Sequence, residues 1–151
     1  VKLQSRLPFL LPDERIQITR EMPDWQNAIR MASAPLLDNG FINRNYIEKA
    51  IDMVETDKRF IMIADGVIIA HAGVDDGVYS MGMALLKLPE KLSFNGYMDA
   101  DIIVVLATPD KTRHLPALYQ LFDLLEDEGN ISAMRRAQDA HEIARLIRKY
   151  I

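Results

Sequence analysis

One short apolar run limits the fold more than any other feature of this chain. Residues 102–106 read IIVVL, without the alternation of polar and apolar side chains that a half-exposed strand shows. A strand of this kind is buried on both faces, as in sheets that helices cover on two sides. We therefore expect residues 101–107 to form a central strand with helices packed above and below it.

Further stretches have the composition of strands. Residues 15–20 alternate polar and apolar side chains, which is typical of a half-buried strand at a sheet edge. Residues 60–63, 67–70 and 78–88 are rich in aliphatic and β-branched residues. Turn-forming residues separate these stretches: Asp65, Gly66, Gly77, Pro89 and Pro109. The middle of the chain is thus predicted to supply most of the sheet.

Helical periodicity marks the regions on either side of these strands. Residues 25–37 follow a candidate N-cap at Asp24, residues 44–56 follow another at Asn43, and Gly40 supplies a helix stop between them. Three C-terminal helices are predicted over residues 113–126, 131–137 and 140–151, with Gly129 ending the first of them. The predicted fold class is α/β, a three-layer α/β/α sandwich with a mixed sheet of about five strands flanked by helices.

Length and composition favour a single domain that occupies residues 1–151. A chain of this size buries enough surface for a full core, and residues 1–12 are interpreted as a lead-in to a domain excised from a longer protein. The chain has no cysteine, no apolar run near the ~20 residues that a membrane helix needs, and a net charge of −4 with both signs interspersed. We expect a cytoplasmic domain without membrane insertion or direct nucleic-acid contact.

Two of the three histidines lie where predicted strands give way to loops. His71 follows residues 67–70, and His114 begins the amphipathic helix that comes after the central strand. In open α/β sheets the crevice outside the strand ends is the usual position of a functional site. Imidazole, with an unperturbed pKa of about 6.5, is largely neutral and nucleophilic near pH 7. A histidine at such a position is therefore suited to accept a group and release it again.

The surroundings of both histidines favour an anion. Gly73 and Gly77 can give the loop after His71 a concave arrangement of backbone N–H groups, because glycine tolerates positive φ. Pro116 places His114 in the first turn of its helix, where free N–H groups and the helix dipole favour negative charge. Together these features predict a phosphoryl pocket.

Other interpretations of the same residues stay open at this point. Either histidine can be a partly exposed, hydrogen-bonded surface residue without a chemical role. Asp75 and Asp76 with the two histidines have the chemistry of hard metal ligands, although Asp-Asp-Gly is also an ordinary turn sequence. The third histidine, His141, is most simply a solvated helix residue.

Four stretches carry a resemblance to a known family. They read VIIAHAGVDDGV at residues 67–78, SMGMALLKL at 80–88, VVLATPD at 104–110 and HLPAL at 114–118. From Trp25 onward the chain resembles the enzyme IIA domain of the fructose/mannitol/ascorbate branch of the bacterial phosphoenolpyruvate-dependent sugar phosphotransferase system (PTS). The resemblance implies the type-2 IIA fold, phosphorylation of His71 by the phosphocarrier protein HPr, and a His114 that helps to hold the phosphoryl group. No cofactor and no metal are expected.

The same resemblance implies a partner and a context. A phosphorylated carrier donates to an enzyme IIB component in sugar uptake. Residues 10–16 and 24–30 look more like the C-terminal IIA-like domain of a BglG-type transcriptional regulator, an antiterminator in which phosphorylation adjusts a larger protein. The alternative is a non-phosphorylated binding module that keeps only the fold.

This chain departs from the family pattern close to the first histidine. The family usually has proline before that histidine and often arginine shortly after it, where this chain has Ala70 and Gly73. Loss of the arginine removes one possible phosphate partner. The remaining candidates for phosphate binding are Gly73 itself, Arg59 and Arg113.

Overall fold

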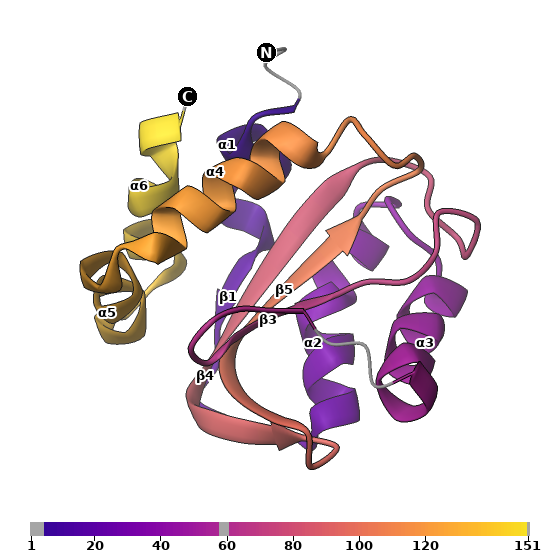
Figure 1. Ribbon diagram of the computed structural model, residues 1–151, viewed down its shortest axis with the longest axis horizontal. Helices are drawn as coiled ribbons and strands as arrows, with labels where there is room; N and C mark the ends of the chain where they lie inside the picture. Colours follow the sequence, from indigo (N-terminus) through magenta and orange to yellow (C-terminus); the bar gives the residue numbers. More distant parts are fainter. Residues whose placement is uncertain (1–4, 58–60, 151) are drawn as a thin grey trace.

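A sheet between two layers of helices organises the chain (Figure 1). The computed structural model describes residues 5–57 and 61–150. The strands within them are β1 (Ile16–Ile18), β2 (Ile61–Ala64), β3 (Val67–Ala70), β4 (Gly82–Phe94) and β5 (Met98–Ala107). The helices are α1 (Leu7–Leu10), α2 (Trp25–Asp38), α3 (Arg44–Asp52), α4 (Leu115–Glu126), α5 (Glu128–Arg136) and α6 (Ala140–Ile147). Single 3-10 turns lie at Asp13–Arg15 and Arg148–Tyr150, and a π-helical turn at Met53–Asp57 follows α3.

The sheet is mixed, as predicted, with strand order β1-β4-β5-β3-β2. β1 pairs with β4 and β3 with β5 in parallel, whereas the β4–β5 and β2–β3 pairs are antiparallel. β1 lies at one edge, in agreement with the alternating pattern of its sequence. β5 lies at the centre, between β4 and β3.

Each face of the central strand packs against its own layer of helices. Ile102, Val104 and Leu106 belong to a core with α1, α4, α5 and α6, whereas Ile103 and Val105 belong to a core with α2 and α3. Figure 1 shows these two groups of helices on opposite sides of the sheet. The unbroken apolar run therefore predicted the sandwich correctly, because a period-two strand divides its side chains between both faces.

Side-chain caps fix the beginnings of α2 and α3 where the sequence predicts them. Asp24 accepts a hydrogen bond from the backbone N–H of Asn27 at 2.9 Å, and Asn43 accepts one from that of Tyr46 at 3.1 Å. Gly40 has a φ of +75° just after α2, so it provides the predicted stop.

Several predicted boundaries differ from the structure, and those at Pro89 and Gly129 are wrong for reasons that the contacts explain. β4 continues past Pro89 to Phe94, and the pairing with β5 shifts register between Lys87 and Leu92. Proline removes one ladder hydrogen bond, and the sheet accommodates it with this irregularity instead of ending the strand. Gly129 does not end α4; it lies in the first turn of α5, and its N–H donates to the capping side chain of Asp127.

The segment interpreted as a lead-in contributes to the core. Leu7, Leu10 and Leu11 are fully buried beside α4 and α6. Arg15 holds this segment to the sheet: its Nε donates to the carbonyl of Met83 in β4 and its Nη2 to that of Leu10, both at 3.0 Å. The Arg15 side chain is also buried, and its guanidinium lies over the Phe41 ring. Residues 7–15 are thus part of the domain.

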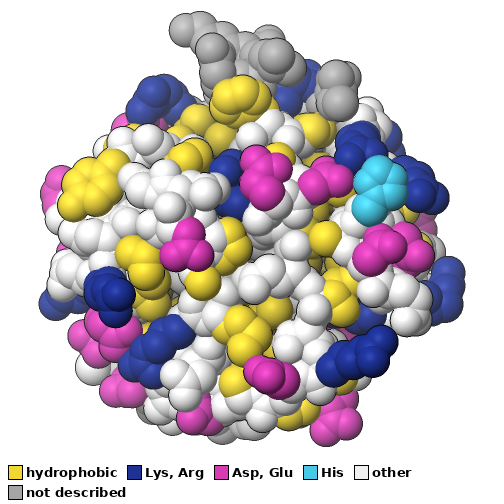
Figure 2. All heavy atoms as spheres, turned by 180° about the vertical axis from the view of Figure 1, so that it is seen from behind, with side chains coloured by type: hydrophobic (Ala, Val, Ile, Leu, Met, Phe, Trp, Pro, Cys, Tyr) yellow, Lys and Arg dark blue, Asp and Glu magenta, His cyan; other side chains and the backbone are white. Residues whose placement is uncertain are grey.

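The helix lengths and one face of the surface can be compared with the expectations about membranes and nucleic acid. No helix in the described ranges is long and apolar enough to cross a membrane. Figure 2, which views the molecule from behind, shows basic and acidic side chains intermingled on that face, without a continuous basic patch.

Replacing Arg15 with methionine should destabilise the domain by about 1–3 kcal/mol, because the buried carbonyls of Leu10 and Met83 lose their donors. Urea unfolding measures this change, and Arg20→Met, at an exposed position of the same segment, is the control. Equal stability of the two variants would contradict the role given to Arg15.

Candidate active site

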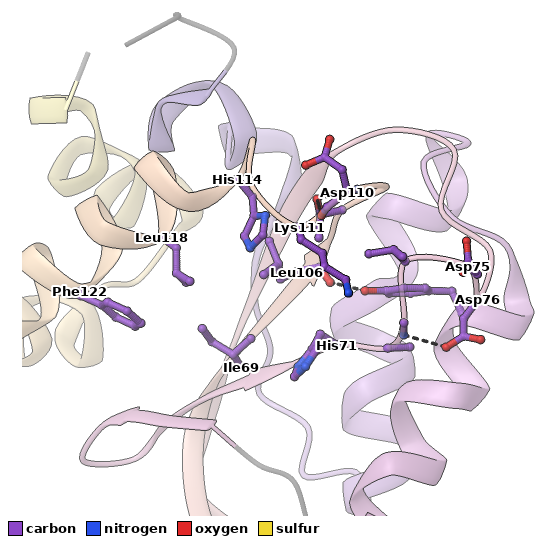
Figure 3. Close-up of a pocket in the computed structure, with 15 residues that line it drawn as sticks. Ile69, His71, Asp75, Asp76, Leu106, Asp110, Lys111, His114, Leu118 and Phe122 are labelled. Carbon is purple, nitrogen blue, oxygen red and sulfur yellow. Dashed lines mark hydrogen bonds between the residues drawn. The ribbon is translucent and has the colours of Figure 1, made fainter.

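The parallel pairing of β3 and β5 brings the two histidines to one edge of the sheet. Ala70, the last residue of β3, pairs with Val105, and β5 ends shortly afterwards at Ala107. His71 follows β3 directly, and residues 108–114 lead from β5 into α4. Both histidines line a single cavity of about 640 Å³ (Figure 3). The structure thus unites the two candidate residues that the sequence singles out.

The cavity combines an apolar wall with charged groups. The apolar part comes from both layers and the sheet: Tyr46, Ile69, Ala72, Val74, Leu106, Leu118 and Phe122. Asp75, Asp76, Asp110 and Lys111 supply the charges, and Thr108 supplies a hydroxyl. Figure 3 shows the side chain of Lys111 directed inward, toward the space between the two histidines. An anion that enters from solvent therefore meets both signs of charge beside imidazole.

His114 is buried, with only 9 % of its surface exposed. Desolvation lowers its pKa below the ordinary value, and the negative charge of Asp110 opposes this only in part. Its Nδ1 is enclosed and has no hydrogen-bond partner among the described residues. Figure 3 shows the far end of the ring directed into the cavity. The lowered pKa favours the neutral imidazole at pH 7, and the tautomer of that form with its proton on Nε2 can donate toward the cavity.

The loop before α4 is held by its own carboxylate. Asp110 accepts hydrogen bonds from the backbone N–H groups of Arg113 and Thr112, both at 2.9 Å, and from the side chain of Arg113. These bonds, the one from the Arg113 N–H first, hold the pKa of Asp110 well below its usual range. Thr108 adds a bond from its hydroxyl to the Asp110 carbonyl at 2.6 Å. This short turn fixes the backbone that carries Lys111 and His114.

The structure gives a different result for each of the three predicted phosphate ligands. Arg113 is largely exposed, pairs with Asp110 and does not line the cavity. Arg59 lies outside the described residues. Gly73 lines the cavity, but its N–H donates to the Asp76 carboxylate at 2.7 Å. Neither of the two described candidates thus offers an uncommitted donor to the cavity.

The expected groups of free backbone N–H donors are also smaller than predicted. Of the two glycines in the loop after His71, only Gly77 has the positive φ on which the expected nest depends. At the start of α4, the Leu115 N–H bonds to the Thr112 carbonyl, and Pro116 has no N–H. The N–H groups of Gly73 and Leu115 are therefore already engaged within the protein.

Tyr46, Thr108 and Lys111 are polar residues of the cavity that the sequence did not mark as candidates. Tyr46 of α3 donates its hydroxyl to the Leu106 carbonyl at 2.5 Å, and burial raises its pKa to about 12. Its helical spacing marks it only as a core residue. Thr108 and Lys111 lie in the loop after β5, and their position between a strand end and His114 was the available signal.

The N-terminal end of α3 anchors the loop after His71. The Asn43 N–H donates to the Gly77 carbonyl at 3.0 Å, and Asn45 Nδ2 donates to that of Asp76 at 2.9 Å. A side chain on Gly77 has no space, because its Cβ would lie 1.9 Å from Asn43 Oδ1. The side chain of Asn43, which caps α3, is therefore in close contact with Gly77 of the loop.

The metal interpretation finds no support in the geometry. Over residues 5–57 and 61–150, no group of three or more histidine, aspartate or glutamate side chains is arranged to hold a metal ion. Asp76 and Asp110 instead bind backbone N–H groups of their own loops.

Comparison with known proteins agrees with this geometry. The model of the family described as "Phosphoenolpyruvate-dependent sugar phosphotransferase system, EIIA 2" matches residues 9–150, so the chain belongs to this family of PTS enzyme IIA domains. Its relatives are phosphotransferase components, and the chain is accordingly a phosphotransferase-type PTS domain.

Individual relatives cover nearly the whole chain. The mannitol-specific cryptic phosphotransferase enzyme IIA component of Escherichia coli is 28% identical over 143 residues, which are 94% of this chain and 97% of the relative. Its solution structure covers 95% of this chain and 99% of that chain with a TM-score of 0.86. The ascorbate-specific EIIA component of Salmonella typhi is 28% identical over 141 residues, 91% of this chain and 92% of the relative.

A more distant neighbour shares the fold. It is the enzyme IIA of an Escherichia coli complex of mannitol enzyme IIA with phosphorylated enzyme IIB, with a TM-score of 0.75 and 18% identity. The match covers 90% of this chain and 95% of that chain.

Replacing Gly77 with alanine should destabilise the domain by roughly 2 kcal/mol or more, because it strains a φ of +122° and displaces the Asn43 cap. Gly40→Ala is the matched control: its φ is +75°, but its Cβ meets no atom within 4 Å. Chemical denaturation compares the two, and a larger loss for Gly40→Ala would contradict the shared contact.

The free energy of unfolding should depend on pH as expected for a buried histidine with a lowered pKa. Because the folded-state pKa is lowered, the unfolded chain binds a proton first as pH falls below about 6.5, and folding is weakened. Stability should therefore decline between pH 7.5 and 5.5 more steeply in the wild type than in His114→Gln, by at most about 1.4 kcal/mol per pH unit. Denaturation curves at several pH values test this, and parallel declines would show that residue 114 does not titrate as described.

Proposed function

We propose that His71 accepts a phosphoryl group from phospho-HPr and that His114 helps to hold it. The observation that carries this proposal is the shared cavity, in which His71 and a buried, neutral His114 lie at the same strand-end edge. Enzyme IIA membership agrees with a phosphoacceptor role. We place the exchange in the cytoplasm, where HPr would meet the domain.

The reaction proposed is an in-line transfer. The lone pair of one ring nitrogen of His71 attacks phosphorus, the new nitrogen–phosphorus bond forms, and the bond between phosphorus and HPr breaks, leaving its electron pair on HPr. The three phosphoryl oxygens are unchanged in number and carry the negative charge. His114 Nε2–H donates to one of them, which is why a neutral imidazole with its proton toward the cavity suits this role. Positioning and charge stabilisation supply the catalysis.

The onward acceptor proposed is an enzyme IIB component. The Escherichia coli neighbour of the same fold is described in a complex with phosphorylated enzyme IIB. The cavity of this chain opens beside exposed loop residues, Asp75 and Lys111 among them, and this opening would let a second protein approach. The phosphoryl group would pass from His71 to that partner by the reverse of the loading step.

A second context is regulatory. Residues 10–16 and 24–30 favour a IIA-like domain of a BglG-type transcriptional regulator, in which phosphorylated His71 would act as a charge switch. The same chemistry serves both contexts. The domains that accompany this one in its full-length chain distinguish them, because a regulator carries nucleic-acid-binding and control domains.

Incubation with phosphoenolpyruvate, enzyme I and HPr should add one acid-labile phosphate to the wild-type domain, detectable by intact mass. His71→Ala should remain unlabelled, and His114→Ala should be labelled roughly 10²-fold more slowly, because one donor to the phosphoryl oxygens is lost.

His141→Ala is the control, since His141 lies on α6, pairs with Asp13 and does not line the cavity. Its labelling should equal that of the wild type. A wild-type domain that takes no phosphate from its cognate HPr would favour the non-phosphorylated binding module, and label on His71→Ala would identify a different acceptor.

A further inference from the structure

The carboxylates that line the cavity would repel the negative charge of a phosphoryl group. A phosphoryl group on a side chain carries about −1.5 to −2 charges at pH 7, and the cavity is already lined by the carboxylates of Asp75, Asp76 and Asp110. Burial lowers the pKa of His114, which makes its imidazole a poorer counter-charge than a permanently charged side chain. A stable phosphohistidine at this place needs a cation close to the phosphoryl oxygens.

Lys111 is the sole lysine or arginine among the residues that line the cavity in the described structure. Within residues 5–57 and 61–150 its ammonium group has no ion pair or side-chain hydrogen bond, in contrast to Arg113, which is engaged by Asp110. Figure 3 shows the Lys111 side chain extending inward from the loop before α4. Its charge is therefore available to an incoming anion.

The backbone of Lys111 is held on both sides. Asp110 accepts hydrogen bonds from the N–H groups of Thr112 and Arg113, and the Thr108 hydroxyl bonds to the Asp110 carbonyl. The turn thus fixes where the lysine side chain begins, while its four-carbon stem leaves Nζ free to follow the phosphoryl group. In the same turn, the Asp110 carboxylate is ionised and already bonded to Arg113, so it does not pair with Lys111.

We propose that Lys111 is the cationic phosphoryl ligand of this site, with Nζ donating to the phosphoryl oxygens during transfer and in phospho-His71. The proposal rests on the function assigned to His71 and adds the group that balances its charge. It gives the role expected of Arg59 or Arg113 to a residue of the cavity itself. Nζ acts as a charge and donor and exchanges no proton with the phosphoryl group.

Two measurements on the same variants test this. The first follows the rate at which phospho-HPr labels the wild type, Lys111→Met and Lys111→Arg. The second titrates inorganic phosphate into the unphosphorylated domains and follows the His71 and His114 ring signals by NMR. Lys49→Met, which removes an exposed lysine of α3 outside the cavity, is the matched control.

Lys111→Met should slow labelling and weaken phosphate binding by about tenfold to a hundredfold, as expected for loss of one charge-assisted hydrogen bond. Lys111→Arg should stay within a few-fold of the wild type, because it keeps the charge and the donors. Lys49→Met should change neither quantity, and thermal unfolding of all three variants should match that of the wild type within about 0.5 kcal/mol.

The labelling rates and the phosphate titration together distinguish a wrong role for Lys111 from a wrong function for His71. Equal labelling rates and equal phosphate binding in the wild type and Lys111→Met would overturn the role of Lys111 while leaving His71 as acceptor. Absence of labelling by phospho-HPr, with phosphate binding that still requires Lys111, would refute the transfer function and keep Lys111 as the anion ligand. If the wild type takes neither label nor phosphate, both proposals are wrong.

Discussion

The parallel pairing of β3 with β5 is the constraint on which the site depends. Because parallel neighbours run in the same direction, the loops after Ala70 and Ala107 leave the sheet at the same edge, and His71 and His114 lie on those loops. Antiparallel pairing would send the two loops to opposite edges. Both strands are buried on both faces, so a one-residue slip would exchange the side chains of the two cores. The register of the sheet therefore also fixes the relative position of the histidines.

Charge in the cavity is divided between groups that hold the loops and groups that face the ligand. Asp76 accepts the Gly73 N–H, and Asp110 accepts those of Thr112 and Arg113. These bonds occupy the three backbone N–H groups within the protein. The cost of desolvation makes His114 neutral, which suits a hydrogen-bond donor and leaves positive charge to Lys111. The carboxylates of Asp76 and Asp110 thus order the loops on either side of the cavity.

Local sequence signals predicted the fold well and the details of the site only in part. The apolar run at residues 102–106, the caps at Asp24 and Asn43, and the alternating edge strand were sufficient for the three-layer sandwich. Pro89 was misjudged because a register shift that spares the strand depends on the partner strand, β5.

The missed residues share a physical reason. The leucines of α1 are buried by packing against α4 and α6, and Arg15 bonds to the carbonyl of Met83, so both depend on residues far along the chain. Whether a donor such as the Gly73 N–H is free depends on which carboxylate the folded loop brings to it. Tyr46 and Lys111 likewise enter the cavity from segments whose local patterns indicate only a helix face and a polar loop. Tertiary contacts of this kind leave no local periodicity to detect.

The central claim is that His71 and His114 serve one phosphoryl group from opposite sides of a shared cavity. Nitrogen-15 NMR of the histidine rings before and after phosphorylation examines it most directly, with His141 as an internal reference far from the cavity lining. The account predicts a phosphorus–nitrogen coupling on His71, a marked shift of the His114 Nε2 signal, and an unchanged His141. A phosphorylated His71 that leaves the His114 signals unmoved would contradict it.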